Sequence, residues 1–349
     1  MKIIFAVDDV ATNRIMVKNA LENHYMVYPL PSSEKMFKLL EKITPDLILL
    51  DIDMPDKNGF EVLELLKADK HYKSVPVIFL TGELDPSAEI RGFEMGVMDF
   101  IIKPFSAPIL IRRIETHIET DNLIKKNVKA VHDLHFTIIG AIANLVESRD
   151  VVTGKHIERT QEYLKILVEE LVRVGVYADE ISGWDMSLLL PSAQLHDVGK
   201  IKISDVVLNK PGKLTDEEFA IIKTHSSEGE RVICDIIDKN KENDFLVHAK
   251  RFAGSHHEKW NGTGYPRGLS GEDIPLEGRI MAIADVYDAL VSKRPYKKPF
   301  THEEAVEIIK KDSGTHFDPH MVKAFLNVAD KFKRKSEMIM QTSEEANLS

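Results

Sequence analysis

Residues 46–51 read Asp-Leu-Ile-Leu-Leu-Asp, a short and continuous apolar run that ends in an acidic residue. Similar runs occupy residues 3–7, 75–80 and 99–102, and helix-like patterns such as residues 59–66 lie between them. Short apolar runs that alternate with amphipathic helices are typical of a parallel β-sheet covered by helices on both faces. The first part of the chain therefore predicts an α/β domain.

Polar side chains follow these runs at the points where the predicted strands end. Asp8 and Asp9 follow the first run, Asp51 closes the second, Thr81 follows the third and Lys103 follows the fourth. Functional residues of parallel sheets gather at the carboxyl ends of the strands. Three carboxylates in one place repel each other, and a hard cation such as Mg²⁺ with its preference for oxygen ligands would offset that repulsion.

Residues 1–120 resemble the receiver domain of bacterial response regulators. The resemblance implies a doubly wound five-stranded parallel sheet, with Asp51 as the phosphoacceptor and a sensor histidine kinase as the partner that phosphorylates it. It also implies that Mg²⁺ is held by Asp8, Asp9, Asp51 and the backbone carbonyl of Asp53. The residues expected to respond to phosphorylation are Thr81, Phe100 and Lys103.

A second group of polar residues lies in the other half of the chain. Residues 256–266 read His-His-Glu-Lys-Trp-Asn-Gly-Thr-Gly-Tyr-Pro, residues 196–200 read His-Asp-Val-Gly-Lys, and His225 and Asp285 lie apart from both. Imidazoles and carboxylates bind divalent transition metals, and a carboxylate shared between cations is typical of two-metal centres that hydrolyse phosphate esters. Any one of these side chains alone would be an ordinary core or surface residue, but the set favours a metal site.

Two local expectations accompany this set. His196 and Lys200 are four residues apart, so we expect them on one face of a helix. Asp285 lies in an otherwise apolar helical pattern, where a buried carboxylate is costly without a partner, and a cation would supply that partner.

Residues from about 145 to 300 resemble the HD-GYP domain, a branch of the HD phosphohydrolases. The matching segments are residues 149–150, 153–160, 195–201, 210–214, His225, the Gly-Tyr-Pro segment, and residues 274–276 and 294–296. The resemblance implies an all-α fold that hydrolyses the second messenger cyclic di-GMP to linear pGpG, to GMP, or to both.

The resemblance also implies the metal ligands, which are His196, Asp197, His225, His256, His257 and Asp285, with Asp197 as the bridge. Two divalent transition metals are implied, with Fe or Mn favoured and Zn, Ni and Co left open. His156 matches a further ligand position of members with a third metal, but those members carry a glutamate four residues earlier, where this chain has Val152. We therefore expect a two-metal centre and count His156 as a doubtful ligand.

The same resemblance assigns the residues that contact the substrate. Asp197 and Lys200 are expected to be catalytic. Asp197 would bridge the two metals, and the positive charge of Lys200 beside the phosphate would stabilise developing negative charge. Lys200, Tyr265, Arg294 and Lys297 are expected to bind the phosphates or bases of the dinucleotide.

Two other functions remain open at the level of sequence. The chain would be a signalling scaffold if it bound a cyclic dinucleotide or a diguanylate cyclase partner without useful hydrolysis. Alternatively, it would be a hydrolase that prefers pGpG or another cyclic dinucleotide, because the metal ligands would be the same.

The chain divides into four parts on these patterns. We expect a receiver domain at residues 1–120, a helical linker at 121–145, an HD-GYP domain at 146–330 and a polar tail at 331–349. The linker has helical spacing and could form the seam of a parallel homodimer. Its apolar positions are Val128, Val131, Leu134, Ile138, Ile142 and Leu145.

Composition limits the classes of function. A net charge of −10 over 349 residues argues against a broad basic surface, so we expect no nucleic acid polymer as a partner. Cys234 is the single cysteine, which excludes an internal disulfide and agrees with a reducing cytoplasm. The apolar runs are too short to span a membrane and no signal-peptide pattern precedes the first strand, so we expect a cytoplasmic protein without membrane association.

Overall fold

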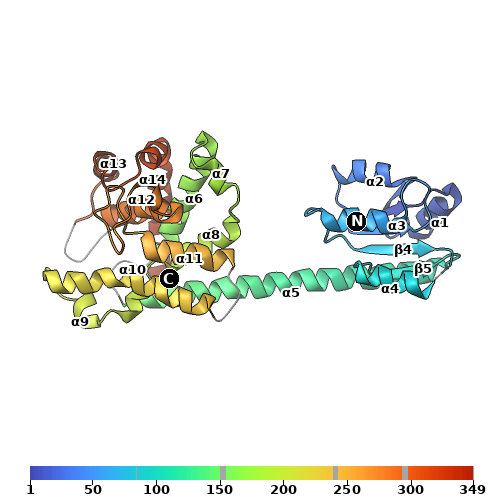
Figure 1. Ribbon diagram of the computed structural model, residues 1–349, viewed down its shortest axis with the longest axis horizontal. Coiled ribbons are helices and arrows are strands. Elements are labelled where there is room, and N and C mark those ends of the chain that lie inside the picture. The colour runs from blue at the N-terminus through green and yellow to red at the C-terminus, as the bar shows by residue number, and fades with distance from the viewer. Residues whose placement is uncertain (84, 150–154, 239–242, 293–297, 349) are drawn as a thin grey trace. The chain divides into compact units, whose positions relative to one another are not determined.

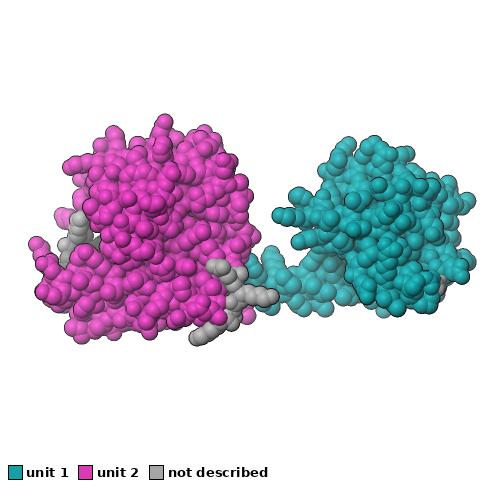
Figure 2. All heavy atoms as spheres, viewed as in Figure 1, with its two compact units in different colours: residues 1–132 teal, residues 133–349 magenta. Residues whose placement is uncertain are grey.

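The computed structural model describes residues 1–83, 85–149, 155–238, 243–292 and 298–348 (Figure 1). Contacts within the chain divide it into two compact units, residues 1–132 and 133–349 (Figure 2). Helix α5, Ala107–Glu147, begins in the first unit and ends in the second. The long connecting helix predicted from the sequence is therefore present.

The first unit contains a five-stranded parallel sheet with the strand order β2-β1-β3-β4-β5. This confirms the predicted α/β fold. The strand missing from the sequence analysis is the edge strand, β2, whose residues are mostly half-exposed and include Pro29. The strands are β1 (Ile3–Val7), β2 (Met26–Leu30), β3 (Leu47–Asp51), β4 (Val77–Thr81) and β5 (Asp99–Ile102).

Helices cover both faces of this sheet, because successive side chains of a strand point to opposite faces. Ile48 and Leu50 of β3 belong to one buried cluster, whereas Leu47 and Leu49 belong to the other. Continuous apolar runs are thus explained by burial on both sides. The helices of this unit, besides the start of α5, are α1 (Ala11–Leu21), α2 (Ser33–Leu40), α3 (Gly59–Ala68) and α4 (Pro86–Glu94).

The described residues of the second unit form helices and no strand, which confirms the predicted all-α fold. After the end of α5 the α-helices are α6 (His156–Val174), α7 (Ala178–Ile181), α8 (Met186–Ser192), α9 (Asp205–Leu208), α10 (Asp216–Ile237), α11 (Asp244–Ser255), α12 (Leu276–Val291), α13 (His302–Lys311) and α14 (Pro319–Leu348). Three short 3₁₀ helices are η1 (Ala193–Leu195), η2 (Val198–Lys202) and η3 (Gly271–Asp273).

Two apolar clusters hold this unit together. In the larger one, Tyr163 of α6 stacks on Phe332 of α14 and meets Tyr287 of α12 edge to face. In the smaller one, Ile139 near the end of α5 packs with Ile233 of α10 and with residues of α11. The end of α5 is therefore part of the core of the second unit.

The carboxyl end differs from the expected polar tail. Helix α14 continues to Leu348, and Phe332, Ser336 and Ile339 are buried. These residues are four and three positions apart, so they share one helix face that packs inwards while the charged residues between them face outwards.

None of the described helices combines the length and the apolar character needed to cross a membrane.

Candidate metal centre and phosphoacceptor site

The acidic residues predicted at the strand ends of the first unit meet at one place. Asp8, Asp9 and Asp51 each bring a carboxylate oxygen within 4.8 Å of the others. Lys103 lies beside them, with its Nζ 2.9 Å from Asp8 Oδ2 and 2.7 Å from Asp51 Oδ1. The strand ends thus bring three carboxylates and one ammonium group together, a donor set of oxygens that suits Mg²⁺.

The charges of this site do not cancel. Burial raises the pKa of Asp51, and the neighbouring charge of Asp8 raises it further, whereas the hydrogen bond from Lys103 acts in the opposite direction. Two carboxylates with one lysine leave net negative charge in a buried place, which a divalent cation would offset.

The remaining residues named for this unit lie around the acidic cluster or its sheet. Thr81 ends β4 and its hydroxyl donates to the carbonyl of Glu83 at 2.6 Å. Phe100 is buried and meets Phe79 and Phe93 edge to face. Asp53 is exposed, two residues after Asp51.

Five segments of the second unit bring its predicted metal ligands together. His196 and Asp197 lie between η1 and η2, His225 lies within α10, and residues 256–257 follow α11. Asp285 belongs to α12, and His156 is the first residue of α6. Side chains that are up to 129 residues apart in the sequence, from His156 to Asp285, therefore converge on one place.

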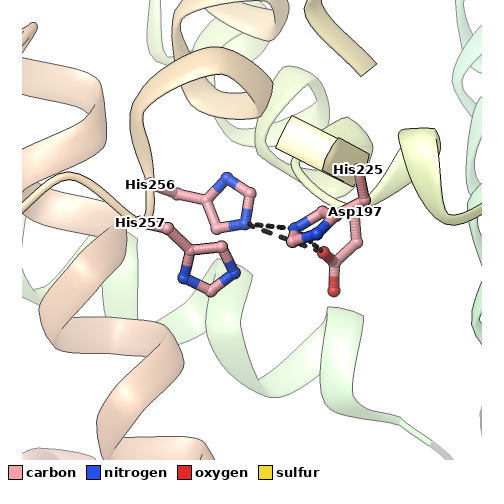
Figure 3. Close-up of side chains that lie close together, drawn as sticks. All are labelled: Asp197, His225, His256 and His257. Atoms are coloured by element: carbon pink, nitrogen blue, oxygen red, sulfur yellow. Dashed lines mark hydrogen bonds and ion pairs between the residues drawn. The ribbon is translucent and has the colours of Figure 1, made fainter. Parts of the chain in front are cut away.

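Two groups of donors result. Ligand atoms of Asp197, His225, His256 and His257 lie within 4.8 Å of one another (Figure 3). Ligand atoms of His156, His196 and Asp285 form a second group and also lie within 4.8 Å of one another. Each group mixes imidazole and carboxylate, the donor set of divalent transition metals.

Asp197 connects the two groups through its two carboxylate oxygens. Its Oδ1 lies 3.2 Å from His225 Nε2 and 3.7 Å from His256 Nε2. Its Oδ2 lies 3.5 Å from His196 Nε2. Each oxygen therefore faces imidazoles of a different group, which is the arrangement expected of a carboxylate that bridges two cations.

Backbone carbonyls orient three of the rings. Nδ1 of His196 lies 2.8 Å from the carbonyl oxygen of Ala193, Nδ1 of His225 lies 2.7 Å from that of Ile222, and Nδ1 of His256 lies 2.9 Å from that of Phe252. A carbonyl only accepts, so each Nδ1 carries the proton and each Nε2 presents a lone pair.

Two such lone pairs face each other, because His225 Nε2 and His256 Nε2 are 3.3 Å apart. Nε2 of His196 is buried and has no hydrogen-bond partner among the described residues. Buried acceptors without donors are costly, and one cation in each donor group would satisfy these lone pairs. The residues present therefore fit a divalent metal.

The charges at this centre favour metal binding at neutral pH. Burial lowers the pKa of His196 to about 4 and holds the pKa of His257 well below its ordinary value, so both rings stay neutral. Although burial acts in the opposite direction, the charge of Lys200 and the hydrogen bond with His225 hold the pKa of Asp197 well below its usual range. Neutral imidazoles and an ionised carboxylate are the forms that bind metals.

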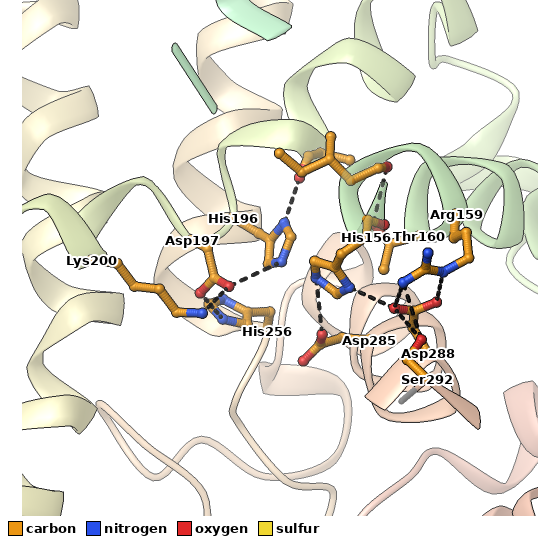
Figure 4. Close-up of polar contacts among 12 residues, drawn as sticks. His156, Arg159, Thr160, His196, Asp197, Lys200, His256, Asp285, Asp288 and Ser292 are labelled. Carbon is orange, nitrogen blue, oxygen red and sulfur yellow. Dashed lines mark hydrogen bonds and ion pairs between the residues drawn. The ribbon is translucent and has the colours of Figure 1, made fainter. Parts of the chain in front are cut away.

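His156 belongs to the second group of donors. Its Nδ1 lies 2.8 Å from Asp288 Oδ2, while its Nε2 lies 3.5 Å from Asp285 Oδ1 (Figure 4). Burial opposes protonation, but the hydrogen bond with Asp288 raises the pKa of His156 to about 9. Asp288 also accepts from Arg159 at 2.6 Å. The ring is thus held with Nε2 towards Asp285, and Nε2 would release its proton on binding a cation of that group.

The prediction that His196 and Lys200 share one face of a helix is wrong. Both lie in a segment of 3₁₀ helices, which have about three residues per turn. Lys200 is therefore aligned with Asp197, three residues before it, and its Nζ lies 2.8 Å from Asp197 Oδ2. The lysine faces the bridging carboxylate directly.

A pocket of about 360 Å³ opens over the centre. Lys200 and Tyr265, two of the expected substrate-binding residues, belong to its wall. The others, Arg294 and Lys297, lie outside the described residues, as does Val152. The wall consists of Glu147, His156, Asp197, Lys200, Leu208, Leu214, Ile222, His225, His257, Tyr265 and Asp285.

The Gly-Tyr-Pro loop is held by a buried glutamate. Glu258 accepts hydrogen bonds from the backbone of Arg267 at 2.8 Å and of Leu269 at 3.0 Å. Gly264 packs so closely on this segment that a Cβ there would lie 2.3 Å from the backbone nitrogen of Lys259. The loop is thereby folded back, and the ring of Tyr265 lies 4.8 Å from that of His257.

Three residues of the site escaped the sequence analysis. Asp288 follows Asp285 by three positions in an apolar helix, and that spacing of two acids on one face was a usable signal. Glu258 lies inside the segment between His257 and the Gly-Tyr-Pro motif, where nothing separated it from a surface residue. Glu147 lies at the end of α5, and only the fold brings it to the pocket.

Comparison with known proteins finds one family in each half of the chain. Residues 140–321 match the HD domain, and residues 4–115 match the response regulator receiver domain. The fold and these matches define a receiver domain joined to an HD domain, and the chain belongs to the HD domain family, as a response regulator.

Individual relatives align over most of this chain. A probable cyclic di-GMP phosphodiesterase of Vibrio cholerae is 39% identical over 93% of the chain and 77% of its own length. The cyclic di-GMP phosphodiesterase response regulator RpfG of Xanthomonas campestris is 32% identical over 93% of the chain and 86% of its own length. A 3'3'-cGAMP-specific phosphodiesterase 2 of Vibrio cholerae is 34% identical over 87% of the chain and 56% of its own length.

Proposed function

We propose that this protein is a response regulator that hydrolyses cyclic di-GMP at a two-metal centre in its second unit. The observation that carries the proposal is the position of Asp197, whose two carboxylate oxygens face different groups of imidazoles at 3.2–3.7 Å. The phosphodiesterase activity in the names of the relatives supports the same substrate class.

The residues of the centre have separate roles in this proposal. One cation would be held by Asp197, His225, His256 and His257, and the other by Asp197, His196, Asp285 and His156. Bound there, divalent metals would offset the charge of the phosphate and supply an acidified water at neutral pH.

The chain's own groups would bind and orient the phosphodiester. Lys200, which is 2.8 Å from Asp197 and faces the pocket, would bind a non-bridging phosphate oxygen and stabilise the charge that develops on it. Tyr265 would stack on a base or donate to the phosphate. Addition of water would break one P–O3' bond and leave a 5'-phosphate on one nucleoside and a hydroxyl on the other.

The first unit would control this activity. Asp51 would accept a phosphoryl group from a sensor histidine kinase, with Mg²⁺ held by Asp8, Asp9, Asp51 and the carbonyl of Asp53. Lys103, at 2.7 Å from Asp51, would bind the phosphoryl group, and Thr81 and Phe100 would respond to it.

A second copy of this chain is a proposed partner. Apolar side chains of α5 recur at intervals of four and three residues and are exposed, with His135 at the one polar position of the series. This is the heptad spacing of a two-stranded coiled coil. The exposed apolar members are Ile124, Val128, Val131, Ile138, Ile142 and Leu145.

The test is turnover measured together with metal content. The full chain is purified anaerobically and loaded separately with Fe²⁺, Mn²⁺, Zn²⁺, Ni²⁺ or Co²⁺, and hydrolysis of cyclic di-GMP, pGpG and 3'3'-cGAMP is followed. We expect two cations per chain and fastest hydrolysis of cyclic di-GMP. Asp197→Asn should reduce turnover by at least about 100-fold, whereas the exposed Asp179→Asn should leave it unchanged.

Each alternative gives a distinct result in the same assay. Binding of cyclic di-GMP without hydrolysis under any metal would favour the signalling scaffold, and faster hydrolysis of pGpG or 3'3'-cGAMP would change the substrate. Beryllofluoride serves as the phosphoryl mimic. If it left the turnover of the unchanged chain unaltered, and if Asp51→Asn had that same turnover, the proposed control by phosphorylation would be wrong.

A further inference from the structure

Glu147 places a carboxylate at the metal centre that no part of the proposed function uses. It is the last residue of α5 and belongs to the wall of the pocket that also contains His156, Asp197 and Asp285. Its Oε1 is buried and has no hydrogen-bond partner among the described residues. A buried carboxylate oxygen without a donor is costly, so this position implies a partner of positive charge.

The surroundings of Glu147 identify the side of the centre that it faces. A small cavity beside the main pocket is walled by Glu147, His156, His196 and Asp197, together with Gln194 and apolar residues of α5, α6 and η2. His156 and His196 belong to the second group of donors, with Asp285 as the third member.

This donor group has room for another ligand. His156, His196 and Asp285 contribute three atoms, and the bridging Asp197 contributes a fourth, whereas iron and manganese accept up to about six ligands. Val152, four residues before His156, has no donor atom and cannot be that ligand. Glu147 approaches from a different element, nine residues before His156.

We propose that the carboxylate of Glu147 is a further ligand of the cation held by His156, His196 and Asp285. The carboxylate lies beside this group and is not among the atoms within 4.8 Å of one another, so it would turn about its side-chain bonds towards the cation. This inference rests on the proposed metal centre, and it adds to that centre a ligand supplied by the helix that comes from the first unit.

The experiment measures Mn²⁺ binding to the full chain without substrate. Affinity and stoichiometry are obtained by calorimetry and by electron paramagnetic resonance for the chain and for Glu147→Gln, which keeps the shape and removes the charge. We expect one of the Mn²⁺ ions to bind at least about tenfold more weakly to Glu147→Gln. Glu158→Gln, an exposed glutamate of the first turn of α6, is the matched control and should bind as the unchanged chain does.

Stability without metal separates a ligand from a structural residue. If Glu147 is a metal ligand, it has no partner in the metal-free protein, and its buried carboxylate lowers stability there. Glu147→Gln should then raise the midpoint of urea unfolding in metal-free buffer while it weakens Mn²⁺ binding. A loss of metal-free stability together with the weaker binding would indicate a structural role and overturn the proposal. Glu147→Asp, which keeps the charge, should recover part of the affinity.

Two further results have different meanings. Identical Mn²⁺ affinity and stoichiometry in Glu147→Gln and in the unchanged chain would overturn this inference and leave the two-metal centre intact. Failure of the unchanged chain to bind Mn²⁺, Fe²⁺ or Zn²⁺ at all would overturn the proposed metal centre and this inference with it.

Discussion

At the scale of single residues, the second unit depends on charges that are buried and paired. Asp288 is 1% exposed and accepts from Arg159, which is 3% exposed, and from His156. Such a pair contributes little net stability when it is complete, because desolvation of both charges offsets their attraction. Its effect is on geometry, since it points His156 at Asp285.

Asp288→Asn should therefore affect both stability and metal binding. The buried guanidinium of Arg159 would lose its counter-charge, which we expect to cost about 3–5 kcal/mol of the free energy of unfolding. His156 would lose the acceptor that orients it, and the affinity for one cation should fall by about 10–100-fold. Urea unfolding and Mn²⁺ titration measure the two effects.

The exposed Asp179→Asn controls for the loss of one negative charge. Unchanged Mn²⁺ affinity in a folded Asp288→Asn chain would show that the orientation of His156 does not depend on this carboxylate.

At the scale of elements, one close contact between backbones positions the metal ligands. A Cβ at Gly199 would lie 1.9 Å from the carbonyl oxygen of His225 and 2.5 Å from the nitrogen of Gly229. Segment η2 can therefore lie directly on α10 only with glycine at residue 199. This contact places Asp197, at the start of η2, against His225 of α10.

Gly199→Ala should push η2 away from α10. We expect a loss of about 1–3 kcal/mol in the free energy of unfolding, as for overpacked cores, and a large loss of metal affinity and turnover because Asp197 moves away from His225. Denaturant unfolding and metal titration of the full chain measure both.

Gly183→Ala is the matched control, because a Cβ there meets only the carbonyl oxygen of Glu180 at an ordinary 3.7 Å. If Gly199→Ala kept the stability and metal affinity of the unchanged chain, the contact would not be what positions the ligands.

At the scale of the whole molecule, the two units have separate cores and are joined by α5. The chain carries a net charge of −10, yet the centre that would bind an anionic dinucleotide carries Lys200 and, as proposed, two divalent cations. Local charge at the site therefore opposes the charge of the molecule as a whole.

Val131→Glu tests whether the exposed face of α5 joins two copies. Val131 is 69% exposed and central in the apolar series, so a glutamate there would place two like charges in the seam of a coiled coil. We expect the unchanged chain to sediment with twice the mass of one chain and Val131→Glu to sediment with the mass of one. Ala130→Glu introduces the same residue one position earlier, outside the series, and should keep the larger mass.

A single-chain mass for the unchanged protein at micromolar concentration would contradict this assembly. The same mass for both glutamate variants would show that the seam lies elsewhere.

Much of this protein follows from its sequence alone. The apolar run at residues 46–51 and the similar runs in the first unit require burial on both faces, and they therefore determined the parallel sheet. The acidic residues at the strand ends came together because parallel strands end at the same edge of a sheet. The weak edge strand β2 carried too little apolar pattern to be found. For the second unit, residue types and spacing indicated a metal site and a helical fold.

Only the tertiary structure decided how those residues are arranged. The sequence does not contain the 3₁₀ geometry that aligns Lys200 with Asp197, nor the carbonyls that fix the ring protons of three histidines. It also could not place Glu147 at the centre. Such contacts join positions far apart in the chain, and their geometry depends on how whole helices pack, which local residue patterns do not determine.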